Sequence, residues 1–560
     1  MATRDFVCKN FGACDRADSR QVIQVPDGAE LKCPECNRPL DGADQNRLDR
    51  PGQVRRKPVV LALCALLVIA AGGYLAYKKF AAPPDGPWNK TLLGRPLRVG
   101  IVTWPGYAGG IVANNGFKPN QDSIYYKRHN LAVEFLLMED VDARAKAFAR
   151  GGKDGVDIVW STVDFWANEL PGFLKSDTKA RAIMQVDWSR GGDAIVADRS
   201  IAKIEDLYGK KISLALFTPS HWLLEYSLQN SSLDEAKQTQ IVKGLVGKNA
   251  SPDARADFVA GKVDAAVVWE PDVAEALQQR AGSHIVVSTR EATKLIADVM
   301  VAREDFIRDH PDVIEAFIQG WTVEGTVEAN RNPNLVAKLL METEPLYKDL
   351  GLDKTIANLS AVRWADLSDN TEMFNLDGKD SQPLFDRLFI QAGKSWVARG
   401  YISTPVSPPA AKDDSFLRKI YQRAPVERIE SVVKKATLED VTKTPITTAH
   451  ITVTFDSGSS ALSAAAKQTV DERVALLPKT FSGAYIRIEG NTDNVGNGTV
   501  NKSLSLRRAQ SVVDYLIAKY GLPKEQFIVV GNGPEKTVAD NDTPEGRAKN
   551  RRTDVSPIAK

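Results

Sequence analysis

Hydrophobic and polar positions follow different patterns in successive parts of this chain of 560 residues. Residues 58–77 form an apolar run without a charged side chain. Farther along, apolar strands such as 97–102 and 156–160 alternate with helical stretches such as 141–149. Near the C-terminus, an alternating strand precedes further helix–strand pairs. Because a chain of this length exceeds one compact core, these changes in pattern predict a multidomain protein.

The apolar run at residues 58–77 is long enough to cross a membrane. A helix of that length, rising 1.5 Å per residue, spans about 30 Å, the thickness of the hydrocarbon core. The run begins after residue 50 and lacks a cleavage site, so we expect a single transmembrane helix that is retained, not a signal peptide. A buried core helix is the alternative, but no amphipathic face is visible. Lys and Arg are more frequent before the run than after it, which favours a cytoplasmic N-terminus.

All five cysteines lie in the first 64 residues, and four of them are spaced like metal ligands. Cys8 and Cys14 form one pair, and Cys33 and Cys36 form the other, with a short β-type stretch between the pairs. Four thiolates suit a structural zinc ion without an open coordination position. The second pair resembles a zinc-ribbon knuckle, whereas the first pair is spaced more widely than usual. We expect a four-cysteine zinc ribbon over residues 1–45; buried thiols or a redox pair are the alternatives.

The middle of the chain, residues 95–402, alternates strand, loop and helix. This order predicts a parallel, doubly wound sheet with ligand crevices beyond the C-terminal strand ends. Ser and Thr at helix N-termini suit an anion, and Trp offers an apolar wall or a face for a cation. The acidic side chains leave an amine-containing or neutral ligand open. The candidate solute contacts at these strand ends are Trp104, Thr162, Asp164, Asp187, Ser220, His221, Trp269 and Glu270.

Four segments of this region resemble the periplasmic substrate-binding proteins of the nitrate, sulfonate and thiamine-precursor type. They are LRVGIVTWPGY, GVDIVWSTVD, IEDLYGKKISLALFTPSHWLLEYSL and FVAGKVDAAVVWEPDV. The resemblance covers roughly residues 95–345 and implies two α/β lobes that close on a small molecule. By sequence order the second lobe occupies about residues 196–285, with crossovers near residues 191–192 and 288–289.

Catalytic motifs do not mark this region. The GxSxG, P-loop, HExxH and GxGxxG patterns are missing from the settings they require, and the five histidines do not cluster in sequence. A triad of His221, Asp187 and Ser220 can be drawn, but nothing else in the sequence supports it. We therefore expect a binding protein and not an enzyme.

Residues 404–412, TPVSPPAAK, are rich in Pro and Ala and predict a linker after a helical extension of the binding domain. The segment that follows is charged and partly helical. We therefore expect residues 403–447 to form a linker and a connecting stalk.

The last part of the chain contains several motifs at close spacing. The turn TDNVG precedes a helix expected at about residues 501–520, and VADN and EGRAKNRR follow. On that helix Asn501, Ser505 and Arg508 are spaced i, i+4 and i+7, so they share one face. Asp493 lies in the preceding turn, and an ordinary surface salt bridge between Asp493 and Arg508 would also fit.

Together these motifs resemble the OmpA-like peptidoglycan-binding domain over residues 448–560, which implies an α+β fold. The resemblance implies that Asp493 binds the ammonium group, and Arg508 the carboxylate, at the zwitterionic end of diaminopimelate in the peptidoglycan stem peptide. Asn501 and Ser505 are expected to add hydrogen bonds.

Charge adds one exclusion, because 73 Lys and Arg against 71 Asp and Glu argue against a nucleic-acid partner. We expect a single-pass inner-membrane protein with a cytoplasmic zinc ribbon and a periplasmic C-terminus. Its expected partners are peptidoglycan, a small solute, the inner membrane and, if it serves transport or signalling of the ABC type, a permease. The alternative is a cell-envelope tether or sensor that links inner membrane and wall without a transport role.

Overall fold

The computed structural model describes residues 3–7, 22–26, 28–38, 40–42, 87–428, 435–453, 455–456 and 458–560. Among these residues, no helix is long and apolar enough to cross a membrane. The span expected at residues 58–77 lies outside the described residues. The chain divides into two compact units, Met1–Pro84 and Asp85–Lys560.

The first unit contains a small antiparallel sheet. Strand β1 (Thr3–Val7) lies between β2 (Val22–Pro26) and β3 (Asp41–Gly42). The apolar cluster on this sheet comprises Phe6, Ile23, Val25, Cys33 and Leu40. A core of this size removes little apolar surface from water, so a metal ion would add much to its stability.

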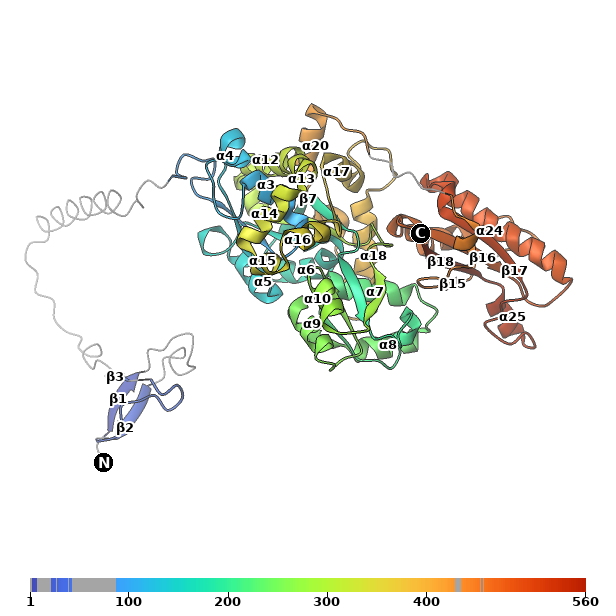
Figure 1. The fold of residues 1–560 in the computed structure, drawn as a ribbon, viewed down its shortest axis with the longest axis horizontal. Coiled ribbons are helices and arrows are strands. Elements are labelled where there is room, and N and C mark those ends of the chain that lie inside the picture. The colour runs from blue at the N-terminus through green and yellow to red at the C-terminus, as the bar shows by residue number, and fades with distance from the viewer. Residues whose placement is uncertain are drawn as a thin grey trace, which may run out of the picture. The chain divides into compact units, whose positions relative to one another are not determined.

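In the second unit, two sheets form a two-lobed α/β body (Figure 1). Lobe 1 contains a six-stranded sheet in the order β14-β7-β13-β6-β4-β5. Its central strands are almost entirely buried, as expected for strands covered on both faces. The strands are β4 (Leu97–Ile101), β5 (Val133–Leu137), β6 (Ile158–Thr162), β7 (Ala180–Ser189), β13 (Ala297–Arg303) and β14 (Val362–Trp364).

Lobe 2 contains a five-stranded sheet in the order β10-β9-β11-β8-β12. The chain crosses into this lobe between β7 and β8 and returns between β12 and β13, at the two positions expected from the sequence. The strands are β8 (Asp193–Ala197), β9 (Ile212–Ala215), β10 (Val246–Lys248), β11 (Ala265–Trp269) and β12 (His284–Ser288).

Helices connect and cover these strands. Those of lobe 2 are η4 (Ile204–Leu207), α7 (Pro219–Gln229), α8 (Glu235–Lys243), α9 (Ser251–Val259) and α10 (Asp272–Gln279). Those that precede β7 in lobe 1 are η2 (Pro105–Tyr107), α3 (Ala108–Asn114), α4 (Ile124–His129), α5 (Val141–Arg150), η3 (Gly152–Asp154) and α6 (Val163–Lys175). After β13 follow α11 (Glu304–Asp309), α12 (Pro311–Gln319), η5 (Gly320–Gly325), α13 (Thr326–Arg331), α14 (Pro333–Thr343), α15 (Pro345–Leu350), α16 (Leu352–Leu359), α17 (Leu367–Phe374) and α18 (Leu384–Ala398).

The segment after α18 packs on lobe 1 instead of standing apart as a stalk. It contains α19 (Pro408–Ala411) and α20 (Ser415–Arg423). Phe416, Leu417 and Ile420 of α20 are buried in the main core. The Pro/Ala composition suggested a linker, but these three apolar positions share one helical face and bury it.

The C-terminal domain has a four-stranded sheet in the order β15-β18-β16-β17. Strand β16 runs parallel to β17 and antiparallel to β18, and the long helix α24 packs on β16 and β17 (Figure 1). The elements are α21 (Leu438–Thr442), β15 (Ala449–Ile451), α22 (Ala464–Arg473), α23 (Leu476–Thr480), β16 (Ala484–Asn491), α24 (Gly498–Tyr520), η6 (Lys524–Gln526), β17 (Phe527–Gly533), α25 (Pro544–Asn550) and β18 (Thr553–Ala559). This arrangement is the expected α+β fold.

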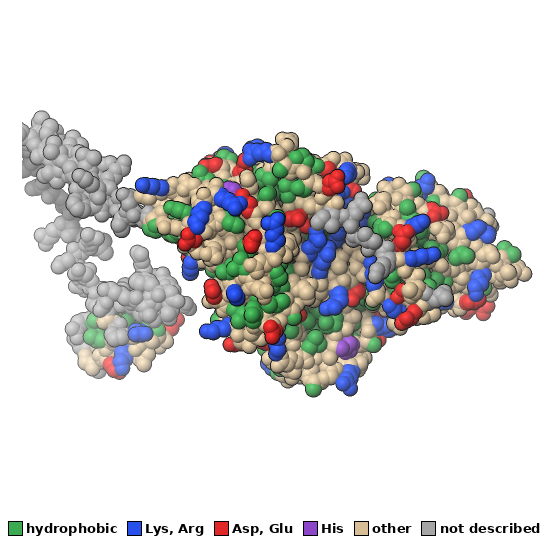
Figure 2. Space-filling model, turned by 45° about the horizontal axis from the view of Figure 1, so that its top comes forward, with side chains coloured by type: hydrophobic (Ala, Val, Ile, Leu, Met, Phe, Trp, Pro, Cys, Tyr) green, Lys and Arg blue, Asp and Glu red, His purple; other side chains and the backbone are tan. Residues whose placement is uncertain are grey.

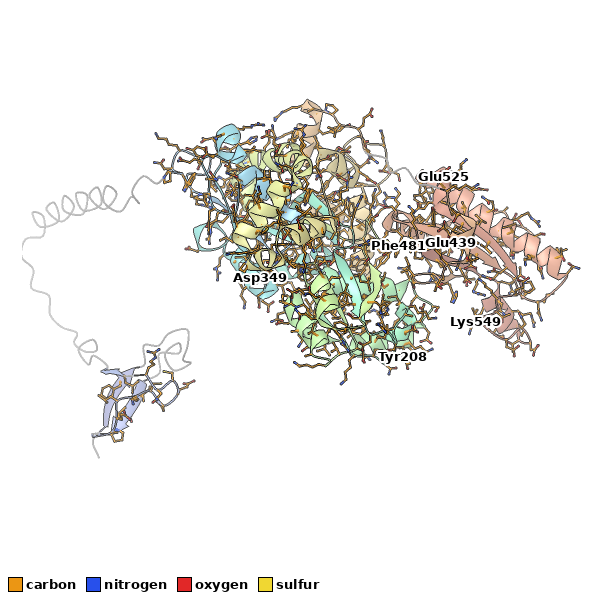
Figure 3. All side chains as sticks on the ribbon, in the orientation of Figure 1. Tyr208, Asp349, Glu439, Phe481, Glu525 and Lys549 are labelled. Carbon is orange, nitrogen blue, oxygen red and sulfur yellow. The ribbon has the colours of Figure 1, made fainter. Side chains whose placement is uncertain are left out.

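The end of α23 contacts the binding domain. Phe481, labelled in Figure 3, has its ring centroid 6.0 Å from that of Tyr226 in α7. The backbone N–H of Lys294 donates to the carbonyl oxygen of Thr480 at 3.1 Å. Phe481 is 2% exposed, so this contact is part of the packed interior.

On the face of the molecule that Figure 2 shows, basic and acidic side chains are interspersed.

Candidate binding sites

A narrow cavity lies between the two lobes of the binding domain. Its volume of about 20 Å³ is enough for a water molecule. Lobe 1 contributes Val102, Trp104, Trp160, Ile296 and Asp298, whereas lobe 2 contributes Asp193, Pro219 and Trp269. Because both lobes form the walls, a change in the angle between them would change the size of the cavity.

Sheet register brings acidic side chains together beside this cavity. In the antiparallel ladder of lobe 1, Asp298 of β13 is opposite both Asp187 of β7 and Thr162 of β6. Directly opposed residues have their Cβ atoms about 5 Å apart, so the two aspartates are neighbours. In lobe 2, Asp193 of β8 is opposite Trp269 of β11.

Two aromatic side chains donate hydrogen bonds to these carboxyl groups. Trp104 donates through Nε1 to Oδ2 of Asp187 at 2.7 Å, and the Tyr107 hydroxyl donates to Oδ2 of Asp298 at 2.7 Å. Gly106 allows the first contact, since a Cβ there would lie 1.4 Å from Oδ2 of Asp187. Gly192 at the crossover allows Trp104 to pack closely, because a Cβ there would lie 2.2 Å from its ring.

Burial strongly perturbs the carboxyl groups of this region. Loss of hydration raises the pKa of Asp164 to about 8 and that of Asp193 to about 7. The pKa values of Asp187 and Asp298 are also raised, first by burial and then by the neighbouring carboxylates. Among the described residues, no Lys or Arg forms an ion pair with Asp187, Asp193 or Asp298. Burial likewise raises the pKa of Glu270 to about 7.

The predicted solute contacts take different places. Trp104 and Trp269 line the cavity, and Asp187 is held by Trp104. The Thr162 hydroxyl caps α6 by accepting the N–H of Phe165 at 3.3 Å. Asp164 is buried in the first turn of α6, and Ser220 is buried beside Pro219. Glu270 accepts the N–H of Ala274 at 3.1 Å.

His221 lies within a cluster of aromatic side chains. Its Nδ1 accepts the N–H of Phe217 at 3.2 Å, and its ring centroid lies 5.2 Å from that of Trp396 and 5.3 Å from that of Tyr401. Burial, followed by the charge of Arg399, lowers the pKa of His221 to about 4. The imidazole is therefore neutral near pH 7 and is held within an aromatic cluster.

Sequence reasoning missed four polar or aromatic residues: Trp160, Asp193 and Asp298 line the cavity, and Tyr107 donates a hydrogen bond to Asp298. Asp298 interrupts an otherwise apolar strand, IADVMVA, and this was a usable signal. Asp193 directly follows the glycine pair of the crossover, and a charged residue at a hinge was a second signal.

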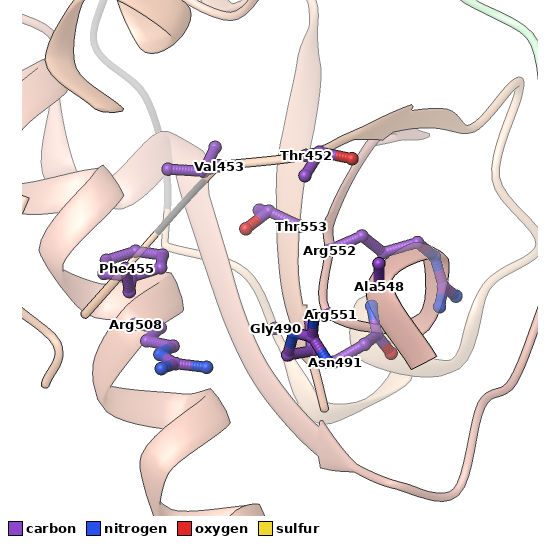
Figure 4. A pocket seen from close by; sticks show the side chains of 10 residues that line it. All are labelled: Thr452, Val453, Phe455, Gly490, Asn491, Arg508, Ala548, Arg551, Arg552 and Thr553. Carbon is purple, nitrogen blue, oxygen red and sulfur yellow. The ribbon is translucent and has the colours of Figure 1, made fainter. Parts of the chain in front are cut away.

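A second pocket lies in the C-terminal domain and has a volume of about 280 Å³ (Figure 4). Arg508 lies beside Phe455 on one side, with its guanidinium carbon 5.0 Å from the ring centroid. Arg508 is oriented by donating through Nε to the carbonyl oxygen of Ser459 at 3.0 Å. The lining residues are Thr452, Val453, Phe455, Gly490, Asn491, Arg508, Ala548, Arg551, Arg552 and Thr553.

Asp493 is paired with an arginine of this pocket. Arg551 donates through Nη1 to Oδ2 of Asp493 at 2.6 Å, and the other oxygen of Asp493 accepts the N–H of Val495 at 3.2 Å. Burial lowers the pKa of Arg508, as does the charge of Arg551, while Asp493 opposes this shift. Arg508, Arg551 and Asp493 therefore form one group of interacting charges.

Asn501 and Ser505 support the pocket from outside its lining. Asn501 donates through Nδ2 to the carbonyl oxygen of Val495 at 2.9 Å, which holds the turn before α24. The Ser505 hydroxyl is buried, donates to the carbonyl oxygen of Lys502 at 2.9 Å and accepts the N–H of Gly533 at 2.9 Å. Both hydrogen-bond sets stabilise the position of α24.

The predicted zinc ligands are only partly described. The turn between Cys33 and Cys36 is closed by hydrogen bonds from the Cys33 N–H to Arg38 at 2.8 Å and from the Asn37 N–H to Cys33 at 2.9 Å. Cys33 is buried and Cys36 is half-buried. Cys8 and Cys14 lie outside the described residues, and the described part of the chain contains no group of three or more His, Cys, Asp or Glu that could hold a metal ion. The turn fits a pair of thiolate ligands. Because only two of the four predicted ligands are described, the zinc site stays a prediction.

Two segments of the chain match known families. Residues 454–551 match the OmpA family, and residues 121–341 match the NMT1-like family.

Among curated relatives, the peptidoglycan-binding protein ArfA of Mycobacterium tuberculosis is 45% identical over 83 residues, which are 15% of this chain and 25% of ArfA. The probable lipoprotein YiaD of Escherichia coli is 36% identical over 104 residues, which are 19% of this chain and 47% of YiaD. The chain thus spans less than half the length of these relatives.

Solved structures that resemble the chain include the periplasmic aliphatic sulphonate binding protein SsuA from Escherichia coli. It is 15% identical, with a TM-score of 0.43, over 56% of this chain and 96% of SsuA. The periplasmic nitrate-binding protein NrtA from Synechocystis PCC 6803 is 13% identical, with a TM-score of 0.44, over 59% of this chain and 89% of NrtA. The chain therefore joins a two-lobed α/β domain, part of which matches the NMT1-like family, to a C-terminal domain that matches the OmpA family.

Proposed function

We propose that this protein binds a small solute between its two lobes and is held to peptidoglycan by its C-terminal domain. The observation that carries the proposal is that one chain combines an interlobe cavity with an arginine-lined pocket in an OmpA-family domain. The proposal includes no catalytic step. Residues 58–77 would anchor the protein in the inner membrane, with residues 1–45 in the cytoplasm around a structural zinc ion.

The arginines of the C-terminal pocket suit the zwitterionic end of a diaminopimelate stem peptide. Arg508 presents a guanidinium group that can pair with the carboxylate through two parallel hydrogen bonds. The ammonium group would approach Asp493, which already accepts a hydrogen bond from Arg551. Binding would therefore rearrange the contact between Asp493 and Arg551.

Retention on purified peptidoglycan tests this part of the proposal. Arg508→Ala and Asp493→Ala should each abolish retention of the purified chain, because each removes one charged partner of the ligand. Arg507→Ala is the matched control, since Arg507 is an exposed arginine on the same helix. Unchanged retention of the Arg508→Ala and Asp493→Ala proteins would refute wall binding through this pocket.

The alternative role, a tether or sensor, is favoured by the contact between α23 and α7. The C-terminal domain packs against lobe 2 through Phe481 and Tyr226, so solute-driven movement of this lobe would be felt by the domain that we propose binds the wall. Uptake of the solute by cells that lack the protein separates the two roles. Normal uptake would favour the tether or sensor, and lost uptake would favour transport.

A further inference from the structure

We infer that the solute is a small organic ammonium cation, held by buried carboxylates and tryptophan rings between the lobes. This inference rests on the proposed function, because it names the chemical class of ligand for the same cavity. Its support comes from the buried carboxyl groups at the cavity, from the tryptophan rings of its walls and from carboxyl oxygens that have no hydrogen-bond partner among the described residues.

The first observation is a group of buried carboxyl groups without a counter-charge. Asp187, Asp193 and Asp298 are 0%, 2% and 4% exposed, respectively. Among the described residues, the Oδ1 atoms of Asp187 and Asp193 have no hydrogen-bond partner. Asp193 and Asp298 line the cavity directly. Because a buried carboxylate is costly unless a cation or donors compensate it, these side chains are arranged to accept a positively charged group.

The second observation is the aromatic wall. Trp104 follows β4, Trp160 lies within β6 and Trp269 ends β11, and all three line the same cavity. Tryptophan has the most favourable ring face for a cation, and this preference is strongest where water is excluded. Arg144 already lies over the Trp160 ring, 4.9 Å from its centroid, but its charge is paired with Glu169. The rings of Trp104 and Trp269 are therefore the ones available to contact a ligand cation.

An anion fits this cavity poorly. The lining residues include no Lys, Arg or His, and an anion would lie beside Asp193 and Asp298. The Thr162 hydroxyl is already used as the cap of α6. A metal ion fits poorly as well, since only Asp193 and Asp298 of the lining offer carboxylate oxygens and the described residues contain no group of three or more potential metal ligands.

Size and protonation set further conditions on the ligand. A cavity of about 20 Å³ admits an organic molecule only if the lobes move apart, and the crossovers at Gly191-Gly192 and Ser288-Thr289 are where such a hinge would act. A compact ammonium group with few substituents requires the least movement. Since burial raises the pKa values of Asp187, Asp193 and Asp298, a bound cation would ionise them and release protons.

The test uses the tryptophan fluorescence of the full chain, because all ten tryptophans lie between residues 88 and 396. The probes are methylammonium, trimethylammonium, guanidinium and choline, with 3,3-dimethylbutan-1-ol as the uncharged isostere of choline. We expect at least one cation to give a saturable change, with the isostere at least about tenfold weaker. Calorimetry of the same cation in two buffers of different ionisation enthalpy should detect released protons.

Variants assign the binding to the cavity. Asp187→Asn and Asp193→Asn should each weaken the cation by about tenfold or more. Asp353→Asn, at an exposed position of α16, should leave affinity unchanged. The unfolding temperature of each variant is measured alongside, and Asp193→Glu, which keeps the charge, should retain more affinity than Asp193→Asn.

Three outcomes overturn the inference. Saturable binding of methanesulfonate or nitrate without binding of any cation would refute it while leaving the proposed solute-binding function intact. Binding of the isostere as tightly as choline would show that shape and not charge selects the ligand. Failure of every cation, anion and neutral probe would overturn both the inference and the proposed function.

Discussion

Replacing Asp193 by asparagine should change how the stability of the solute-free binding domain depends on pH. Burial raises the pKa of Asp193 from its usual value of 3.8 to about 7 in the folded chain. Below the unfolded pKa of 3.8 the carboxyl group is mostly protonated in both states, and the contribution of Asp193 to stability is fully present. As the pH rises toward 7, the unfolded state loses this proton while the folded state keeps it. The free energy of unfolding therefore falls across this range and levels off above the folded pKa.

The size of the effect follows from the shift. At 1.36 kcal/mol per pKa unit, a carboxyl group with these two pKa values lowers the free energy of unfolding by on the order of 2 kcal/mol between pH 5 and pH 8. The groups that face Asp193 titrate in the same direction, so the parent protein loses more than this single contribution. They are Asp164, Asp187 and Asp298 of lobe 1 and Glu270 of lobe 2, and Arg290 acts on Glu270. The Asp193→Asn protein lacks only the contribution of Asp193 to this decline in the free energy of unfolding.

Urea unfolding at pH 5, 6, 7 and 8, followed by tryptophan fluorescence, measures this difference. The signal reports on the binding domain alone, since the first 87 and last 164 residues contain no tryptophan. Asp353→Asn serves as the control for loss of one negative charge at an exposed site. The expected result is a shallower decline for Asp193→Asn, with the control parallel to the parent.

An equal decline from pH 5 to pH 8 in the parent and in Asp193→Asn would refute the reasoning. It would mean that Asp193 is ionised in the folded chain and has a compensating partner. A steeper decline in the variant would refute it as well, because the sign of the linkage would then be reversed.

Further predictions concern packing and the metal. Gly106→Ala should lower the melting temperature, at a cost of about 1–3 kcal/mol for overpacking, because its Cβ would overlap Oδ2 of Asp187 at 1.4 Å; an unchanged melting temperature would contradict this. Phe481→Ala should lower the free energy of unfolding by about 3 kcal/mol in urea titrations, since the ring is 2% exposed, and a loss below 1 kcal/mol would speak against a firm contact with Tyr226. Residues 1–45 should bind one zinc per chain by atomic absorption, and Cys33→Ser should reduce this content; a metal-free ordered ribbon would rule the site out.

The local elements could be predicted because their periodicity depends on neighbours in the chain. The strand expected at residues 97–102 is β4, and the helix expected at about residues 501–520 is α24, which begins three residues earlier, at Gly498. The crossovers were predictable because glycine and small polar residues interrupt the apolar strands there. The motifs of the C-terminal domain were equally visible, since they lie within about 60 residues of one another.

The membership of both pockets depended on contacts between distant segments. Arg551, which follows α25, pairs with Asp493 of the turn before α24 across 58 positions of sequence, and only the folded chain brings them together. His221 was predicted as a ligand contact from its own helix alone, and only the tertiary structure places it against Trp396 of α18 and against Tyr401, which follows that helix.

By itself, the sequence determined the order of the parts of this protein, most of its strands and helices, and the kinds of site to look for. Only the tertiary structure decided that Asp187 and Asp298 are opposed in one ladder and that Asp193, Asp298 and three tryptophans line one cavity. The reason is physical: hydrophobic periodicity is set by adjacent residues, whereas strand order and register are set by the burial of whole elements against one another.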